Sequence, residues 1–198
     1  MKYLEIAPHI KRGDEWDSIR DIKLFEEQIV YDLRNLPING IADNTYDAIY
    51  NEHFIEHLEK DEGIEFLKEM YRILKPGGTL RTVWPAMDFV DFLRSDKCHT
   101  DNRFVRLYLQ QANNDWAPEG IAHHSNQEQC ALTLLYQNGD HKYLWYKDEL
   151  INTCISLGYE NVKQQLYNES EIIGLNGIDT DSVLRRMHST VVESSKPL

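Results

Sequence analysis

The chain has 198 residues, and its 21 Lys and Arg against 33 Asp and Glu give a formal net charge of −12 at pH 7. This length suits a single domain with its own core, and 41% hydrophobic with 27% charged residues is typical of a globular protein rather than a disordered one. The negative charge argues against a surface that binds nucleic acid or an anionic membrane. We therefore expect neither of those partners, and a small or cationic one instead.

The cysteines and the amino terminus predict a cytoplasmic protein. Cys98, Cys130 and Cys154 are odd in number and form no CxxC pair, so neither a disulfide scaffold nor a zinc ribbon is expected. The apolar stretch before Pro8 is too short for a signal peptide, and no apolar run approaches membrane-spanning length. We expect a monomer or a homodimer.

Short apolar runs alternate with amphipathic stretches along the chain. Strands are expected at residues 3–7, 18–22, 29–31, 46–50, 79–84, 159–166 and 189–193. Residues 86–142 are expected to be mostly helical, including a helix at 129–136, and a further helix is expected at 147–157. Alternating strands and helices predict a parallel sheet covered on both faces. The tail from Glu193 onward is expected to be loose.

The clearest predicted helix lies between the strands at 46–50 and 79–84. Asp61 is its expected N-cap, and Pro76-Gly77-Gly78 ends it and turns the chain into the next strand. Apolar residues fall at helical spacing on one face: Ile64, Leu67, Met70, Tyr71 and Leu74. This pattern predicts the helix-to-strand half of a crossover unit.

A motif of about forty residues surrounds this helix. It contains His53-Phe-Ile-Glu56-His57-Leu after a strand, then Leu67-Lys-Glu-Met-Tyr-Arg-Ile-Leu-Lys-Pro-Gly-Gly78 before the next strand. The segment resembles the second half of the core of class I S-adenosylmethionine-dependent methyltransferases. The resemblance extends to Asp32-Leu-Arg-Asn-Leu-Pro37 and to Gly139-Asp-His141 with the residues up to Leu150. It is weakest over 86–128, and its layout is that of a bacterial and phage subgroup of small methyltransferase-like proteins.

The resemblance implies a Rossmann-like α/β fold, with a mostly parallel seven-stranded sheet flanked by helices and one helical insertion. It also implies S-adenosylmethionine as the cofactor. Within one domain, residues 1–85 would bind the cofactor, residues 86–142 would form a helical insertion that caps the acceptor, and residues 143–198 would supply the last helix and strands.

One stretch departs from the family pattern. The family has a Gly-x-Gly-x-Gly loop after its first strand, where this chain has Ala7-Pro8-His9. Ala7 stands in place of the first glycine, and Pro8 removes a backbone donor. Only about ten residues separate this loop from the next predicted strand, so the usual first helix is expected to be shortened or absent.

The cofactor's chemistry indicates which residues would bind it. Its ribose hydroxyls require a carboxylate at the end of the second strand, where Asp21 is favoured over Asp17, although an ordinary exposed Asp is an equal interpretation. The resemblance places Asp32 and Leu33 at the adenine. The other expected cofactor-binding residues are Ala7, Pro8, Asn51 and Glu52. His53 is the expected catalytic residue, facing the cleft where the methyl group is delivered.

The acceptor site is expected just after the strand at 79–84 and in the polar loop before residue 128. Trp84 and Asp88 are the candidates in the first region. The alternative interpretation is that Trp84 belongs to the core and that Asp88 is an ordinary exposed residue. His123 and His124, with Trp116, are the candidates in the second region. The alternative interpretation is that this region is a solvated surface loop. No metal ligand is expected.

Three functions remain open from the sequence. The first is methyl transfer to a small molecule, such as a sugar or sugar-nucleotide, in which the protein mainly aligns donor and acceptor and excludes water. The second is a methyltransferase-fold binding or assembly protein, suggested by Pro8 in the altered loop. The third is a zinc hydrolase, because His53-x-x-Glu56-His57 is also the inverted zinc-protease motif. That alternative needs a further ligand, for which Glu119, His123 and His124 are candidates.

Overall fold

The computed structural model describes residues 1–24, 26–99, 102–111 and 126–198. Its seven-stranded sheet has the order β3-β2-β1-β4-β5-β7-β6. The strands are β1 (Tyr3–Ile6), β2 (Trp16–Arg20), β3 (Ile29–Val30), β4 (Tyr46–Glu52), β5 (Leu74–Pro85), β6 (Glu160–Gln165) and β7 (Ser189–Ser195). Strand β7 is antiparallel to both of its neighbours, and all other pairs are parallel. The mostly parallel seven-stranded sheet predicted from the sequence is confirmed.

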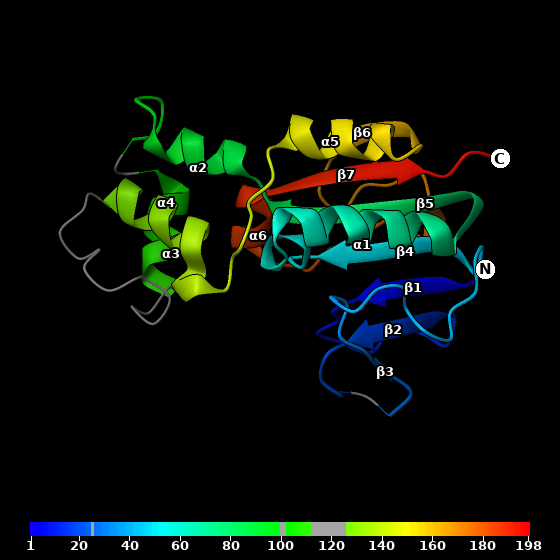
Figure 1. Cartoon of the computed structure of the whole chain (residues 1–198). Helices are drawn as coiled ribbons and strands as arrows, with labels where there is room; N and C mark the ends of the chain where they lie inside the picture. Colours follow the sequence, from blue (N-terminus) through cyan, green and yellow to red (C-terminus); the bar gives the residue numbers. More distant parts are fainter. Residues whose placement is uncertain (25, 100–101, 112–125) are drawn as a thin grey trace.

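Two helices cover one face of the sheet. Helices α1 (Lys60–Ile73) and α5 (Lys147–Ser156) pack their apolar sides against alternate strand residues, such as Leu4, Ile49 and Leu80. In Figure 1, α1 lies in front of strands β4 and β5. Since side chains alternate along a strand, these residues define a single face, which we call the helix face.

The opposite face is covered by the connection between β6 and β7. The intervening strand residues, such as Tyr3, Tyr50 and Val83, pack against Leu175 and Ile178 of this connection. The connection consists of residues 166–182, which include the short helix η5 (Ile173–Leu175), followed by α6 (Val183–His188). We call this second side the loop face.

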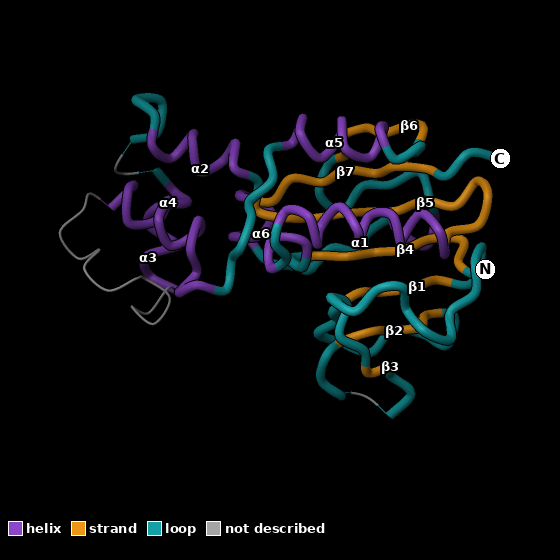
Figure 2. Tube along the Cα trace, viewed as in Figure 1, coloured by secondary structure: helices purple, strands orange, loops and turns teal. Residues whose placement is uncertain are grey.

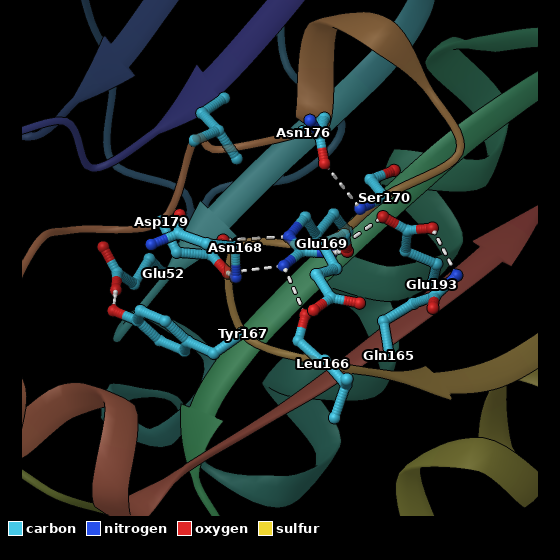
Figure 3. Close-up of polar contacts among 12 residues, drawn as sticks. Glu52, Gln165, Leu166, Tyr167, Asn168, Glu169, Ser170, Asn176, Asp179 and Glu193 are labelled. Atoms are coloured by element: carbon cyan, nitrogen blue, oxygen red, sulfur yellow. Dashed lines mark hydrogen bonds and ion pairs between the residues drawn. The ribbon is translucent and has the colours of Figure 1, made fainter.

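Buried charges hold the loop face together (Figure 3). The Arg81 side chain is fully buried, and its Nε donates to Asp179 Oδ1 at 2.9 Å while its Nη1 donates to Glu193 Oε1 at 2.8 Å. Further bonds run from Arg81 to the carbonyl oxygens of Glu169 and Leu166. Arg81 therefore joins the centre of the sheet to a segment nearly a hundred residues further along the chain.

The connection between β1 and β2 contains no helix. Residues 7–15 are all described and form only turns and irregular backbone, drawn as a loop in Figure 2. Arg12 fixes this loop: its guanidinium donates to the Glu5 carboxylate at 2.6 and 3.0 Å and to Ile178 O at 3.2 Å. The expected loss of the usual first helix is confirmed.

Helix α1 begins two residues earlier than predicted and ends sooner. Its N-cap is Glu59 rather than Asp61, because the Glu62 carboxylate accepts the Glu59 backbone N–H at 2.9 Å and so completes the first turn. Strand β5 starts at Leu74, before the Pro76-Gly77-Gly78 stretch that was expected to end the helix, so Lys75 lies in the strand and pairs with Asp47 at 2.9 Å.

A separate group of helices lies beyond the carboxyl ends of the parallel strands (Figure 1). It contains α2 (Met87–Arg94), α3 (Arg103–Gln111) and α4 (Asn126–Tyr136), and it has its own apolar cluster. The prediction of a mostly helical segment is confirmed for its described residues. The prediction of a loose tail is wrong from Glu193 to Ser195, which pair with β5 and β6. In the part of the chain that the structure describes, every helix is too short or too polar to cross a membrane.

Candidate functional site

A cleft of about 580 Å³ opens at the carboxyl ends of strands β1 to β4. This is the edge at which open α/β sheets bind ligands, and the volume suits a molecule of cofactor size. Residues predicted to bind the cofactor or to carry the chemistry line it together: Ala7, Asp21, Asp32, Leu33 and His53. The structure thus gathers at one cleft residues that the sequence spreads over its first 53 positions.

Two cleft residues have a left-handed backbone. Ala7 follows β1 with a φ of 53°, and His53 follows β4 with a φ of 51°. This conformation costs a residue with a side chain roughly 1–2 kcal/mol, and such strain is often found at functional sites. Ala7 therefore adopts a backbone that suits glycine, at the position where the family has its first glycine. Its methyl group packs against the apolar cluster of the helix face.

Two carboxylates project into the cleft with different partners. The Asp21 side chain is 69% exposed, and its Oδ1 lies 3.9 Å from Arg20 Nε. Asp32 instead accepts two bonds of 2.9 Å from the Arg34 guanidinium, which lower the pKa of the Asp32 carboxyl. Asp21 therefore has the freer oxygens for a ligand's hydroxyl groups, whereas Asp32 would have to share its oxygens with Arg34.

His53 is held at the cleft through both ring nitrogens. Its Nε2 lies 2.8 Å from the Ser189 hydroxyl, and its Nδ1 lies 3.3 Å from Glu56 Oε1. The side chain is 14% exposed, so the ring presents only a small surface to the cleft. This arrangement fixes the imidazole's orientation, which a group that positions an acceptor or takes its proton requires.

The cleft is richer in cations than the chain as a whole. Arg20, Arg34, Lys142 and Arg185 line it, against the carboxylates Asp21, Asp32 and Asp140. Burial, together with the charges of Arg185 and Arg20, lowers the pKa of His9 in the same cleft. In a protein of net charge −12, a lining of four cations against three carboxylates makes the cleft less negative than the chain as a whole.

Three of the predicted cofactor residues lie behind the cleft. Asn51 is buried and donates to Arg81 O and Thr82 Oγ1. The Glu52 carboxylate accepts the Tyr167 hydroxyl at 2.6 Å (Figure 3) and pairs with Arg185 at 3.1 Å. The Pro8 carbonyl accepts from Arg20 Nη1 at 2.8 Å. Glu52 and Pro8 therefore reach the cleft indirectly, by positioning two of its arginines.

The predicted acceptor residues do not line the cleft where the structure describes them. Trp84 is fully buried in the core, and its Nε1–H donates to Trp145 O at 3.0 Å. Asp88 is exposed and accepts the Lys147 backbone N–H at 2.7 Å, at the start of α5. His123, His124 and Trp116 lie outside the described residues, as does Glu119.

Sequence reasoning missed the cleft's cations. Arg20 precedes Asp21, which was predicted to lie at the cleft, so this neighbour could have indicated that Arg20 lies there too. Arg185 lies on α6, which was not predicted, so nothing indicated that it would reach the cleft. Lys142 follows the Gly139-Asp-His141 motif and was noted only as part of the resemblance.

The sheet order and the cleft define the class: a Rossmann-like methyltransferase fold. Residues 15–82 match the family model described as a methyltransferase domain. This segment is about a third of the chain, and over it the chain is similar to the class I S-adenosylmethionine-dependent methyltransferases that its motifs resemble. A comparison with curated proteins found no match.

Solved structures share this fold at low sequence identity. A protein from Archaeoglobus fulgidus, described as a SAM-dependent methyltransferase, is 14% identical with a TM-score of 0.53, over 98% of this chain and 86% of that one. A Thermotoga maritima protein, described as a SAM-dependent methyltransferase and possible histamine N-methyltransferase, is 16% identical with a TM-score of 0.51, over 98% and 81% of the two chains. A possible exported protein from Bordetella parapertussis is 12% identical with a TM-score of 0.52, over 100% and 62%.

Proposed function

We propose that this protein transfers a methyl group from S-adenosylmethionine to a small anionic acceptor. The observation that carries the proposal is the gathering of Ala7, Asp21 and Asp32 at one cleft, at the ends of three neighbouring strands. Bound there, S-adenosylmethionine would supply an electrophilic methyl group on its sulfonium sulfur.

Each of these residues fits one part of the cofactor. The exposed Asp21 carboxylate suits the two ribose hydroxyls, and Asp32 with Leu33 suits the adenine. The left-handed backbone of Ala7 provides the turn that the family forms with glycine, so the chain can bend there despite Pro8. The loop's departure in sequence is therefore compatible with binding.

The remaining cleft residues suit the acceptor. The imidazole of His53 stands at the end of β4, where it can orient the acceptor. If the nucleophile is a hydroxyl, His53 can take its proton at Nε2 once the acceptor displaces the Ser189 hydroxyl from that nitrogen. Lys142 and Arg185 supply positive charge for a phosphate or carboxylate, as in a sugar-nucleotide. The net charge of −12 supports a small acceptor rather than nucleic acid.

Calorimetry with S-adenosylhomocysteine tests the cofactor site. Hydrogen bonds to a charged group contribute about 1.5–3 kcal/mol, so we expect Asp21→Ala to weaken binding about 10- to 100-fold. Asp32→Ala should weaken it less, because Arg34 already occupies that carboxylate. The matched control is Asp96→Ala, an exposed aspartate on the helical group. Absence of binding at millimolar ligand would exclude the transferase and favour a binding or assembly protein with this fold.

A further inference from the structure

A cluster of three potential metal ligands lies at one wall of the cleft. Glu56, His57 and His141 each offer one ligand atom, and these atoms all lie within 4.8 Å of one another. Glu56 and His57 belong to the turn η1 (Ile55–His57) that follows β4. His141 lies in the segment that leads from the helical group back to α5. The cluster therefore joins two distant parts of the chain.

The carboxylate of Glu56 is fully buried, and its charged partner is His53, whose Nδ1 lies 3.3 Å from Oε1. Among the described residues, Oε2 has no hydrogen-bond partner, and the contact of Oε1 with His53 is long. A buried carboxylate with one long contact keeps lone pairs open, and such a group normally binds a cation or a metal ion.

Both histidines of the cluster direct the same nitrogen toward a backbone carbonyl. His141 Nδ1 lies 2.5 Å from Leu134 O, and His57 Nδ1 lies 3.2 Å from Asp140 O. Since a carbonyl only accepts, each Nδ1 carries the proton of the neutral ring, and the lone pair remains on Nε2. His141 Nε2 is buried and has no hydrogen-bond partner within the described ranges of the chain. Metal-binding histidines show this arrangement, in which the outer N–H is fixed by a carbonyl.

We infer that Glu56, His57 and His141 bind one Zn²⁺ ion. Two imidazole nitrogens and one carboxylate oxygen form a set of zinc ligands that leaves a further position open, whereas Mg²⁺ and Ca²⁺ prefer oxygen ligands alone. Ligand atoms of a tetrahedral zinc ion lie about 3.3 Å apart, so the side chains would close in by roughly 1–1.5 Å. His53 would then support the ligand carboxylate rather than bind the metal, because its Nε2 is engaged by Ser189.

This site differs from the zinc site that the sequence motif suggested. The inverted zinc-protease pattern uses both of its histidines, His53 and His57, whereas the structure brings His141 to Glu56 and His57. A zinc ion there would fasten η1 to the segment that returns from the helical group. Because His57 also lines the cleft, the ion would stand at its wall. The inference goes beyond methyl transfer and does not depend on it.

The test is titration of the metal-depleted protein with Zn²⁺ in competition with a chromophoric chelator, without cofactor. We expect one equivalent to bind, and His57→Gln to weaken that binding by at least about 100-fold, since loss of an outer partner alone costs 10- to 100-fold. The matched control is His99→Gln, an exposed histidine on the helical group, which should bind as tightly as the unchanged protein.

Glu56→Gln provides a second variant, which keeps the shape of the buried side chain and removes its charge. We expect it to bind Zn²⁺ at least about 100-fold more weakly as well, and to lose the rise in melting temperature that Zn²⁺ gives the unchanged protein. Equal binding by the unchanged protein and both variants, or no binding to the unchanged protein, would overturn the inference. The readout needs no S-adenosylmethionine, so its failure leaves the proposed transferase untouched.

Discussion

The two faces of the sheet are built in different ways. On the helix face, α1 and α5 bury an apolar cluster that includes Phe66, Leu67 and Leu150. On the loop face, a connection of irregular backbone takes the place of helices and is held by buried ion pairs around Arg81. One face of the sheet is thus covered by helices with a periodic apolar side, and the other by a connection held through polar bonds. Only the periodic apolar side can be recognised in the sequence.

Replacing Arg81 should have the largest effect on stability, and it tests whether ion pairs hold the loop face. Arg81→Met leaves Asp179 and Glu193 buried without their partner, which should lower the free energy of unfolding by about 3–5 kcal/mol in urea denaturation. Arg186→Met is the control, because its guanidinium is 58% exposed beside a fully solvated Asp181, and it should lose less than about 1 kcal/mol. A loss below about 1 kcal/mol for Arg81→Met would show that the ion pairs are dispensable.

Matched truncations compare the apolar packing of the two faces. Leu67→Ala on α1 should cost about 3–4 kcal/mol, because the surrounding helix and sheet cannot collapse into the cavity. Ile178→Ala on the loop face should cost about 2 kcal/mol, since irregular backbone relaxes more readily. Urea denaturation measures both, and equal losses would mean that the loop cover is packed as rigidly as the helices.

The contrast between the faces explains what could be predicted from the sequence. The apolar stripe of α1 and the motif from His53 to Gly78 predicted the helix face, the fold class and the carboxyl-edge site. On the loop face, η5 and α6 carry no periodic pattern, and the partners of Arg81 lie about a hundred residues away. The position of Arg185 in the cleft and the approach of His141 to Glu56 were not predicted for the same reason. Polar pairs between residues far apart in the sequence leave no local pattern.

Acid should weaken the packing of α6 through His188, at the end of that helix, where its ring lies against Phe89 and Phe104 of the helical group. Burial, with the charge of His53, lowers the pKa of His188 to about 3, and its Nδ1–H donates to Leu184 O at 2.6 Å. The unfolded chain has a histidine pKa near 6.5, so between pH 6.5 and about 3 it binds a proton that the folded state does not. Stability is therefore full above pH 6.5 and falls by about 2 kcal/mol on going to pH 5.

The difference between His188→Asn and the unchanged protein isolates this contribution. Asparagine keeps an N–H donor for Leu184 O and does not titrate, so the variant should lose about 2 kcal/mol less than the unchanged protein between pH 7 and pH 5. His99→Gln, an exposed histidine, should leave the acid loss intact. If the variant and the unchanged protein lose stability in parallel, His188 is not the group through which acid acts.

The smallest expected effect concerns Ala7, where the shortened connection between β1 and β2 begins. Its left-handed backbone costs about 1–2 kcal/mol with a side chain, whereas glycine adopts it freely but loses about 0.5–1 kcal/mol more backbone entropy on folding. Ala7→Gly should therefore raise the free energy of unfolding by up to about 1 kcal/mol. Ala48→Gly, in the middle of β4, should instead lower it by about 0.5–1 kcal/mol because no strain is relieved there. Urea denaturation measures both changes in the free energy of unfolding. A gain for Ala7→Gly with a loss for Ala48→Gly would show that Ala7 occupies a position that suits glycine, and equal losses for the two variants would show that this turn is not strained.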